Sequence, residues 1–313
     1  MKTEKARTVL VVGAGVMGSS IAQLFAMGDI DVTLVDVDEK ALERAMVLVE
    51  SGLNTMAEHG KIPRSSVPLV LARIHPSPGL DEKAAEADFV LEAVPEVPEM
   101  KRAVFSRLDR VCGKARVIAS NTSGLDIFSI ADVERPERLL IAHFFAPAHI
   151  IPLVEIVPGS ETSREAILFT RELLEGLGKH PVLMKSFSPG FIVNRIQKAI
   201  GETALEMIEQ GVAGPEEIDL AVKLSLGVRL PILGVVQTFD FQGLDMLLDT
   251  MKNYGRVYSF IEERVKQGRL GVKVSEGIYD YEGRGELEVL KKRDLLFLAM
   301  LDHLRKIRAF ESF

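Results

Sequence analysis

One histidine and one glutamate carry the clearest chemical signal in this sequence. His143 follows a predicted strand at residues 139–142, and Glu155 lies inside the otherwise apolar strand predicted at residues 153–157. A carboxylate buried in an apolar strand is costly unless it is paired. A histidine at a strand end is, taken alone, more often structural than catalytic. The simplest solution is that Glu155 pairs with His143, raises the basicity of the imidazole and fixes its tautomer, which suits a general base near neutral pH.

A cluster of small polar residues follows another predicted strand. That strand covers residues 116–119, and Ser120-Asn121-Thr122-Ser123-Gly124 comes directly after it. Serine and asparagine are ordinary turn and cap formers, so the cluster also has a purely structural interpretation. In an open parallel sheet, however, ligands bind beyond the carboxyl ends of the strands, and this rule makes the cluster a candidate binding site.

A glycine-rich turn near the start of the chain predicts a dinucleotide site. A strand at residues 9–12 is followed by Gly13-Ala14-Gly15-Val16-Met17-Gly18, a helix-compatible stretch at 19–27 and a second strand at 32–35. The first glycine permits a tight turn, the second lets backbone N–H groups approach a pyrophosphate, and the third allows close packing of helix and strand. The pyrophosphate then lies at the positive end of the helix.

The acid that ends the second strand indicates which dinucleotide is bound. Asp36 comes 18 residues after Gly18, and an acid at this place accepts hydrogen bonds from the hydroxyls of an adenosine ribose. A 2′-phosphate would meet like charge there, so we predict NAD as the cofactor. The uncharged run at residues 8–28 also resembles a signal peptide or a membrane span. Its four glycines and the order of strand, turn, helix, strand and acid argue against that interpretation.

The surrounding pattern predicts two domains. Strands and helices alternate at intervals of about 25 to 30 residues through the first part of the chain, which is typical of a doubly wound, mostly parallel α/β sheet of the Rossmann type. We assign residues 1–186 to this NAD-binding domain. After a linker at 185–190 the pattern becomes helical, and residues 187–313 are predicted to form an all-helical C-terminal domain. Its helices are expected at 191–210, 215–224, 238–252, 258–267 and 287–305.

Composition excludes several classes of protein. The 313 residues are enough for two cores, and 47% of them are hydrophobic. A net charge of −7 without a long basic run argues against a nucleic-acid surface. Cys112 is the only cysteine, which favours a reducing compartment such as the cytoplasm. The six histidines never fall at metal-ligand spacing, so we expect no metal, and we expect no nucleic-acid or membrane partner.

Taken together, these motifs resemble the L-3-hydroxyacyl-CoA dehydrogenase family, including its lambda-crystallin and gulonate dehydrogenase relatives. The likeness extends over about residues 8–281 and rests on many motifs that occur in the family's order. They are GAGVMG (13–18), Asp36, LEAVPE (91–96) with Lys101, SNTSG (120–124), HFFAP (143–147), PLVEIV (152–157), PGFIVNR (189–195), GLD (243–245) and GVKVSEGIYDY (271–281).

The resemblance implies roles for particular residues. It makes His143 the general base, oriented and charged by Glu155, and it implies that Ser123 and Asn194 hold the reacting oxygen through hydrogen bonds. It also places Glu96 and Lys101 near the ribose and nicotinamide, and implies a homodimer formed through the C-terminal domain. The expected cofactor-binding residues are Gly13, Gly15, Val16, Met17, Gly18, Asp36, Glu96, Lys101 and Asn121.

Departures from the family pattern leave the substrate open. Ala146 stands where the family often has asparagine, Gly124 replaces the second serine of NTSS, and residues 233–237 replace GPFEL. We predict NAD-dependent, reversible oxidation of a short (3S)-3-hydroxyacyl-CoA to the 3-oxoacyl-CoA. Oxidation of a free hydroxy acid such as gulonate or carnitine is the alternative. A non-enzymatic, crystallin-like NAD-binding protein is a third hypothesis, against which the retention of all four expected catalytic residues argues.

Overall fold

The structure is a computed structural model that describes residues 6–80 and 82–311. The chain divides into two compact units, one ending at Lys198 and the other beginning at Ala199. The first unit contains a single eight-stranded sheet with the order β3-β2-β1-β4-β5-β6-β7-β8. Its strands are β1 (Thr8–Val12), β2 (Asp31–Val35), β3 (Ile74–Ser77), β4 (Phe89–Glu92), β5 (Val117–Ser120), β6 (Leu139–Phe144), β7 (Leu153–Pro158) and β8 (His180–Leu183).

The sheet is doubly wound, as predicted. The strand order reverses at β1, which pairs with β2 on one side and β4 on the other, and the strands from β3 to β6 are parallel. β7 then runs antiparallel to β6, and β8 is parallel to β7. The predicted Rossmann-type, mostly parallel sheet is therefore confirmed.

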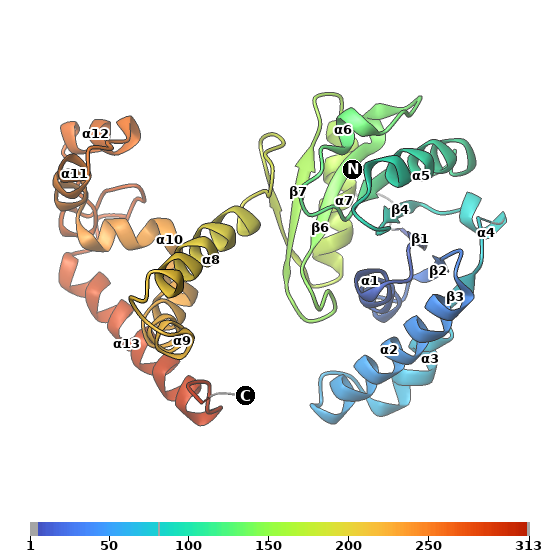
Figure 1. Ribbon diagram of the computed structural model, residues 1–313, viewed down its shortest axis with the longest axis horizontal. Helices are drawn as coiled ribbons and strands as arrows, with labels where there is room; N and C mark the ends of the chain where they lie inside the picture. The colour runs from blue at the N-terminus through green and yellow to red at the C-terminus, as the bar shows by residue number, and fades with distance from the viewer. Residues whose placement is uncertain (1–5, 81, 312–313) are drawn as a thin grey trace. The chain divides into compact units, whose positions relative to one another are not determined.

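Helices cover both faces of this sheet (Figure 1). Side chains alternate between the faces with the period of two expected for a strand: Val9 and Val11 belong to one hydrophobic cluster, and Leu10 and Val12 belong to the other. The helices of this unit are α1 (Val16–Met27), α2 (Glu39–Glu58), α3 (Val67–Leu71), α4 (Glu82–Ala85), α5 (Pro98–Val111), α6 (Ile127–Ile130) and α7 (Arg164–Gly176).

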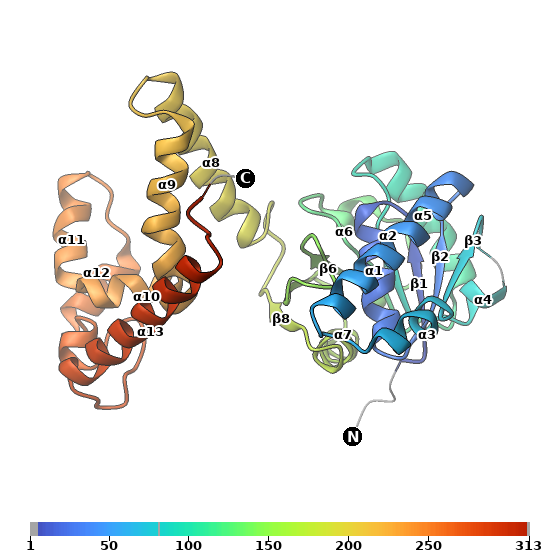
Figure 2. The ribbon, with the colours of Figure 1, turned by 90° about the horizontal axis from the view of Figure 1, so that it is seen from below.

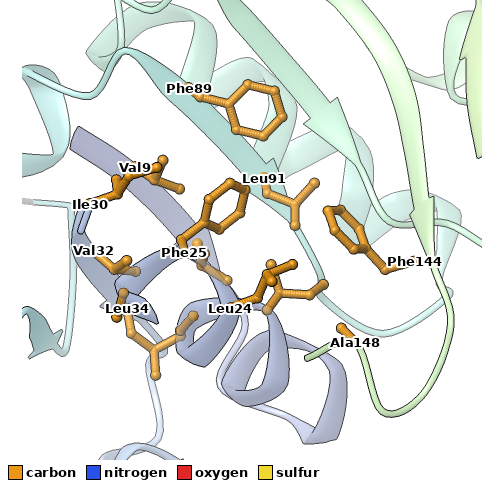
Figure 3. Packing of buried hydrophobic residues seen from close by; sticks show 14 of the residues in the cluster. Val9, Leu24, Phe25, Ile30, Val32, Leu34, Phe89, Leu91, Phe144 and Ala148 are labelled. Atoms are coloured by element: carbon orange, nitrogen blue, oxygen red, sulfur yellow. The ribbon is translucent and has the colours of Figure 1, made fainter. Parts of the chain in front are cut away.

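Aromatic side chains join α1 to the sheet. Phe25 on α1 lies between Phe89 and Phe144, with ring centroids 5.9 and 6.4 Å away (Figure 3). All three rings are buried, and each such side chain contributes about 1.5–3 kcal/mol of hydrophobic stabilisation. This packing anchors the helix whose first turn contains Gly18.

The second unit is helical, as predicted for the C-terminal region. It contains most of α8 (Val193–Glu209), together with α9 (Pro215–Leu224), α10 (Leu226–Gln242), α11 (Leu244–Asn253), α12 (Ser259–Lys266) and α13 (Glu286–Lys306). α13 packs along α10, and α11 packs on α12 (Figure 2). Within residues 6–80 and 82–311, no helix is long and apolar enough to cross a membrane.

One helix predicted in this unit is wrong. Residues 238–252 were expected to form one helix, but α10 ends at Gln242 and α11 begins at Leu244. Gly243 between them has φ 95°, a conformation that interrupts the helix and that glycine adopts easily. The helical stretch before residue 238 was not predicted, because Pro231 and Gly234 obscure its periodicity, and Gly234 with φ 67° does kink α10.

Candidate active site

The glycine turn has the geometry that close contact between the backbone and a pyrophosphate requires. Gly13 adopts φ 108° and its N–H donates to Val35 O at 2.7 Å. A Cβ added to Gly18 would lie 1.7 Å from Gly13 O, so only glycine fits where α1 crosses the turn. A Cβ on Gly15, in contrast, would meet nothing within 4 Å. The space above Gly15, at the N-terminus of α1, therefore fits a pyrophosphate held by backbone N–H groups; Val16 is exposed there and Met17 is half-buried.

Asp36 ties the glycine turn to the end of β2. Its Oδ2 accepts a hydrogen bond from Ala14 N at 2.7 Å, and its Oδ1 accepts one from Asp38 N at 3.0 Å. The carboxylate is half-buried and each oxygen retains a second lone pair. The residue therefore fits a ribose diol and also holds the turn in place.

His143 and Glu155 lie opposite each other on the antiparallel strands β6 and β7. His143 Nδ1 is 2.9 Å from Glu155 Oε2, and both side chains are buried. The other carboxylate oxygen, Oε1, accepts hydrogen bonds from Ile192 N at 3.0 Å and Val193 N at 3.1 Å, where α8 begins. Glu155 thus connects the imidazole to the backbone of the segment that carries Asn194.

The charge state of Glu155 follows from these contacts. Burial alone would raise the pKa of Glu155, but the hydrogen bonds with His143 and with the two backbone N–H groups outweigh it and lower the pKa below its ordinary value. The carboxylate is therefore ionised at neutral pH. An ionised Glu155 accepts the Nδ1 proton of the imidazole, which leaves Nε2 as the nitrogen that can take up a proton.

Ser123 and Asn194 are brought together by the fold, although 71 residues separate them. Asn194 Nδ2 donates to Ser123 O at 3.3 Å. The side-chain oxygen of Asn121, a residue expected to contact the cofactor, accepts a hydrogen bond from Phe144 N at 2.8 Å. That hydrogen bond joins the end of β5 to the end of β6, next to His143.

Lys101 and Glu96 belong to a second group of charged residues. Lys101 is buried on α5, and its ammonium lies 2.7 Å from Glu92 Oε1 and 3.2 Å from Glu96 Oε2. Glu96 in turn accepts hydrogen bonds from Thr122 Oγ1 and from Ser123 N. Burial would raise the pKa of Glu96, but the hydrogen bond from Thr122 and the charge of Lys101 lower it instead.

Sequence reasoning missed Glu92 as a functional candidate. It stands in the apolar strand β4 and is fully buried, just as Glu155 is in β7. The signal that pointed to Glu155, an acid within an apolar strand, was therefore present for Glu92 as well. The predicted catalytic residues and most of the predicted cofactor residues surround the ends of β1, β2, β4, β5 and β6.

Comparison with known proteins assigns the family. The family model described as 3-hydroxyacyl-CoA dehydrogenase, NAD binding domain, matches residues 8–187, and the model described as 3-hydroxyacyl-CoA dehydrogenase, C-terminal domain, matches residues 190–281. The chain belongs to the 3-hydroxyacyl-CoA dehydrogenase family. It is thus an NAD-dependent oxidoreductase, and the predictions of the family, of a dehydrogenase and of NAD are confirmed.

Relatives within the family differ in their named substrates. A probable 3-hydroxybutyryl-CoA dehydrogenase of Bacillus subtilis is 38% identical over 88% of this chain and 98% of its own length. A 5-formyl-3-hydroxy-2-methylpyridine 4-carboxylate 5-dehydrogenase of Mesorhizobium japonicum is 29% identical over 88% of this chain and 91% of its own. The crystal structure of a 3-hydroxyacyl-CoA dehydrogenase from Archaeoglobus fulgidus superposes with a TM-score of 0.77 and 32% identity, covering 97% of this chain and 100% of that chain.

Proposed function

We propose that this protein oxidises short (3S)-3-hydroxyacyl-CoA thioesters to 3-oxoacyl-CoA, and catalyses the reverse reduction. The observation that carries the proposal is the buried His143–Glu155 pair. Its glutamate also accepts from the backbone directly before Asn194, the residue whose side chain contacts Ser123. The 38% identity with a probable 3-hydroxybutyryl-CoA dehydrogenase supports the thioester as substrate.

Each residue has a chemical task in this proposal. Bound NAD supplies the acceptor for the substrate's hydride. His143 takes the proton of the substrate hydroxyl on Nε2, and ionised Glu155 stabilises the imidazolium that results. The Ser123 hydroxyl and the Asn194 amide donate hydrogen bonds to the substrate oxygen, and in the reductive direction they stabilise its negative charge as it develops. Gly13, Gly15, Gly18 and Asp36 bind the cofactor.

A second candidate, oxidation of a free hydroxy acid, is favoured by two observations. Ala146 and residues 233–237 depart from the common family sequence, and one relative is named for a pyridine carboxylate substrate. The two candidates differ in whether the acyl group is presented as a thioester. A non-enzymatic role is disfavoured because His143, Glu155, Ser123 and Asn194 are all present and adjacent.

Turnover of acetoacetyl-CoA and of free keto acids with NADH distinguishes these candidates. Consumption of NADH with the thioester, at kcat/KM at least about a hundredfold above that with free acids, is the expected result. Turnover of free acids alone would refute the thioester proposal and establish the second candidate. Lack of turnover of any of these compounds by a protein that still binds NADH would refute both candidate substrates.

We also propose a homodimer formed through the second unit. None of the α8 residues, all of which are described, has a buried side chain, although the helix has an apolar face that includes Ile196, Ile200 and Ile208. An exposed stripe of this size typically marks an interface. Sedimentation of wild type and of Ile200→Glu tests this: a dimer that becomes a monomer is expected, whereas a monomeric wild type would contradict the proposal. We keep the cytoplasm as the expected compartment on the basis of the single cysteine.

A further inference from the structure

The ammonium group of Lys101 is buried and fully occupied by the protein itself. Its side chain is 1% exposed, and its three N–H groups have three acceptors: Glu92 Oε1 at 2.7 Å, Glu96 Oε2 at 3.2 Å and Val94 O at 3.4 Å. These contacts hold the ammonium group in one place between the two carboxylates. Lys101 therefore acts on its surroundings through the two carboxylates it holds.

Glu92 is the anchor of this group. It is completely buried at the end of β4, where its Oε1 also accepts from Val94 N at 2.8 Å and its Oε2 accepts from Ser120 Oγ at 2.5 Å. Ser120 Oγ in turn accepts from Thr122 N at 3.1 Å. One carboxylate thus fixes the end of its own strand, a lysine on α5 and the end of the neighbouring strand β5.

A second connection reaches the proposed oxygen-binding residue. Lys101 holds Glu96, and Glu96 Oε1 accepts from Thr122 Oγ1 and from Ser123 N, the latter at 2.9 Å. The segment that carries the Ser123 hydroxyl is therefore held from two sides, through Ser120 and through Glu96. Both connections begin at Glu92.

We propose that Glu92 and Lys101 are positioning residues of the active site: their buried ion pair sets the place of Glu96 and of the backbone at Thr122 and Ser123. This inference rests on the proposed function of Ser123. It adds a positioning role to the cofactor contact expected for Lys101 from the family resemblance. If the loss of such a contact displaces a catalytic group by about 1 Å, the rate can fall by about a hundredfold.

The double variant Glu92→Gln/Lys101→Met separates positioning from mere stability. Breaking a buried pair from one side is strongly destabilising, whereas replacing both charges with neutral groups of similar size is often neutral. The amide introduced at position 92 can still accept from Val94 N and donate to Ser120 Oγ. Each single variant should therefore unfold at a temperature lower by about 5 °C or more, and the double variant should recover most of that loss.

Positioning predicts that function does not recover with stability. In the double variant Glu96 lacks Lys101, so hydrogen exchange at the Ser123 amide should be at least about tenfold faster than in wild type. The dissociation constant of NADH should rise by about 10–100-fold, and kcat should fall by about 10–100-fold. If exchange, NADH affinity and kcat all return to wild-type values with stability, the pair is only structural and the proposal is overturned.

Two further variants complete the test. Glu96→Gln alters a partly exposed side chain, so it should lower the unfolding temperature less than either single variant of the buried pair and still accelerate exchange at the Ser123 amide; unchanged exchange would overturn the proposal even if the double variant failed to fold. Glu86→Gln removes a similar ion pair with Lys114, 2.6 Å long but exposed, and should change neither exchange nor NADH binding. Hydrogen exchange and NADH binding are measured without substrate, so they test this inference even if the proposed reaction proves wrong.

Discussion

Two buried glutamates on the same sheet show how one kind of side chain serves two purposes. Glu155 on β7 and Glu92 on β4 are both fully buried, and each has a basic partner and additional hydrogen-bond donors. The partner of Glu155 is a histidine, the side chain that most often serves as a general base. The partner of Glu92 is a lysine with three acceptors around it. In the proposed reaction the first pair transfers a proton, whereas the second holds its neighbours in place.

The two glutamates should differ most clearly in the effect of Glu155→Gln on kcat. The amide oxygen must accept from Ile192 N and Val193 N, so the NH₂ group turns toward His143 Nδ1 and favours the tautomer with its proton on Nε2. That tautomer cannot accept the substrate proton, so kcat should fall by about 10³-fold or more while the dissociation constant of NADH stays within about twofold.

Steady-state kinetics and NADH titration of the same preparation measure both quantities for this variant. A kcat within about threefold of wild type would show that Glu155 serves only to fix α8. Glu92→Gln is the contrasting variant, because it should affect NADH affinity and kcat together.

Ser123→Ala should produce the next largest effect. The substitution removes one donor to the substrate oxygen, while the backbone N–H of residue 123 keeps its bond to Glu96. Loss of such a donor typically lowers kcat by about a hundredfold. Cofactor affinity should not change, which distinguishes this variant from those in the Glu92 group. An unchanged kcat would remove Ser123 from the reaction.

A smaller effect concerns acid stability. The pKa of Glu155 is lowered on folding, so the unfolded chain binds this proton at a higher pH than the folded one. Stability from Glu155 is therefore fully present above its ordinary pKa of 4.5 and is lost as the pH falls below it. The unfolding temperature of wild type should fall toward that of Glu155→Gln between about pH 5 and pH 3.

Thermal unfolding of the two proteins across this pH range provides the measurement. A difference in unfolding temperature that stays constant as the pH falls would contradict the lowered pKa. Glu92→Gln is a useful control, because it shows how much of the fall in unfolding temperature comes from carboxylates other than Glu92.

Some of this architecture was predictable because local sequence determines it. The turn from Gly13 to Gly18 and the alternating apolar strands require only short-range information, and the doubly wound sheet follows from their order. The break at Gly243 was missed because apolar spacing continues across it, and only the backbone conformation of that glycine ends the helix.

The site was predictable only in part. Glu155 was identified by the cost of burying an acid, and the same cost applied to Glu92. What sequence could not show is which donors reach Glu92, since Ser120 lies 28 residues away and the lysine nine residues away. Asn194 was suggested by family resemblance alone, because nothing local to its helix indicates a contact with Ser123.

The central claim is that the chemistry resides in the His143 imidazole, and the most direct measurement is the single-turnover rate of NADH oxidation by acetoacetyl-CoA in wild type and His143→Ala. The variant should react at least about 10³-fold more slowly, since it loses the base that Glu155→Gln only misdirects, while NADH still binds with wild-type affinity. A variant that binds NADH normally and reacts at the wild-type rate would contradict the account.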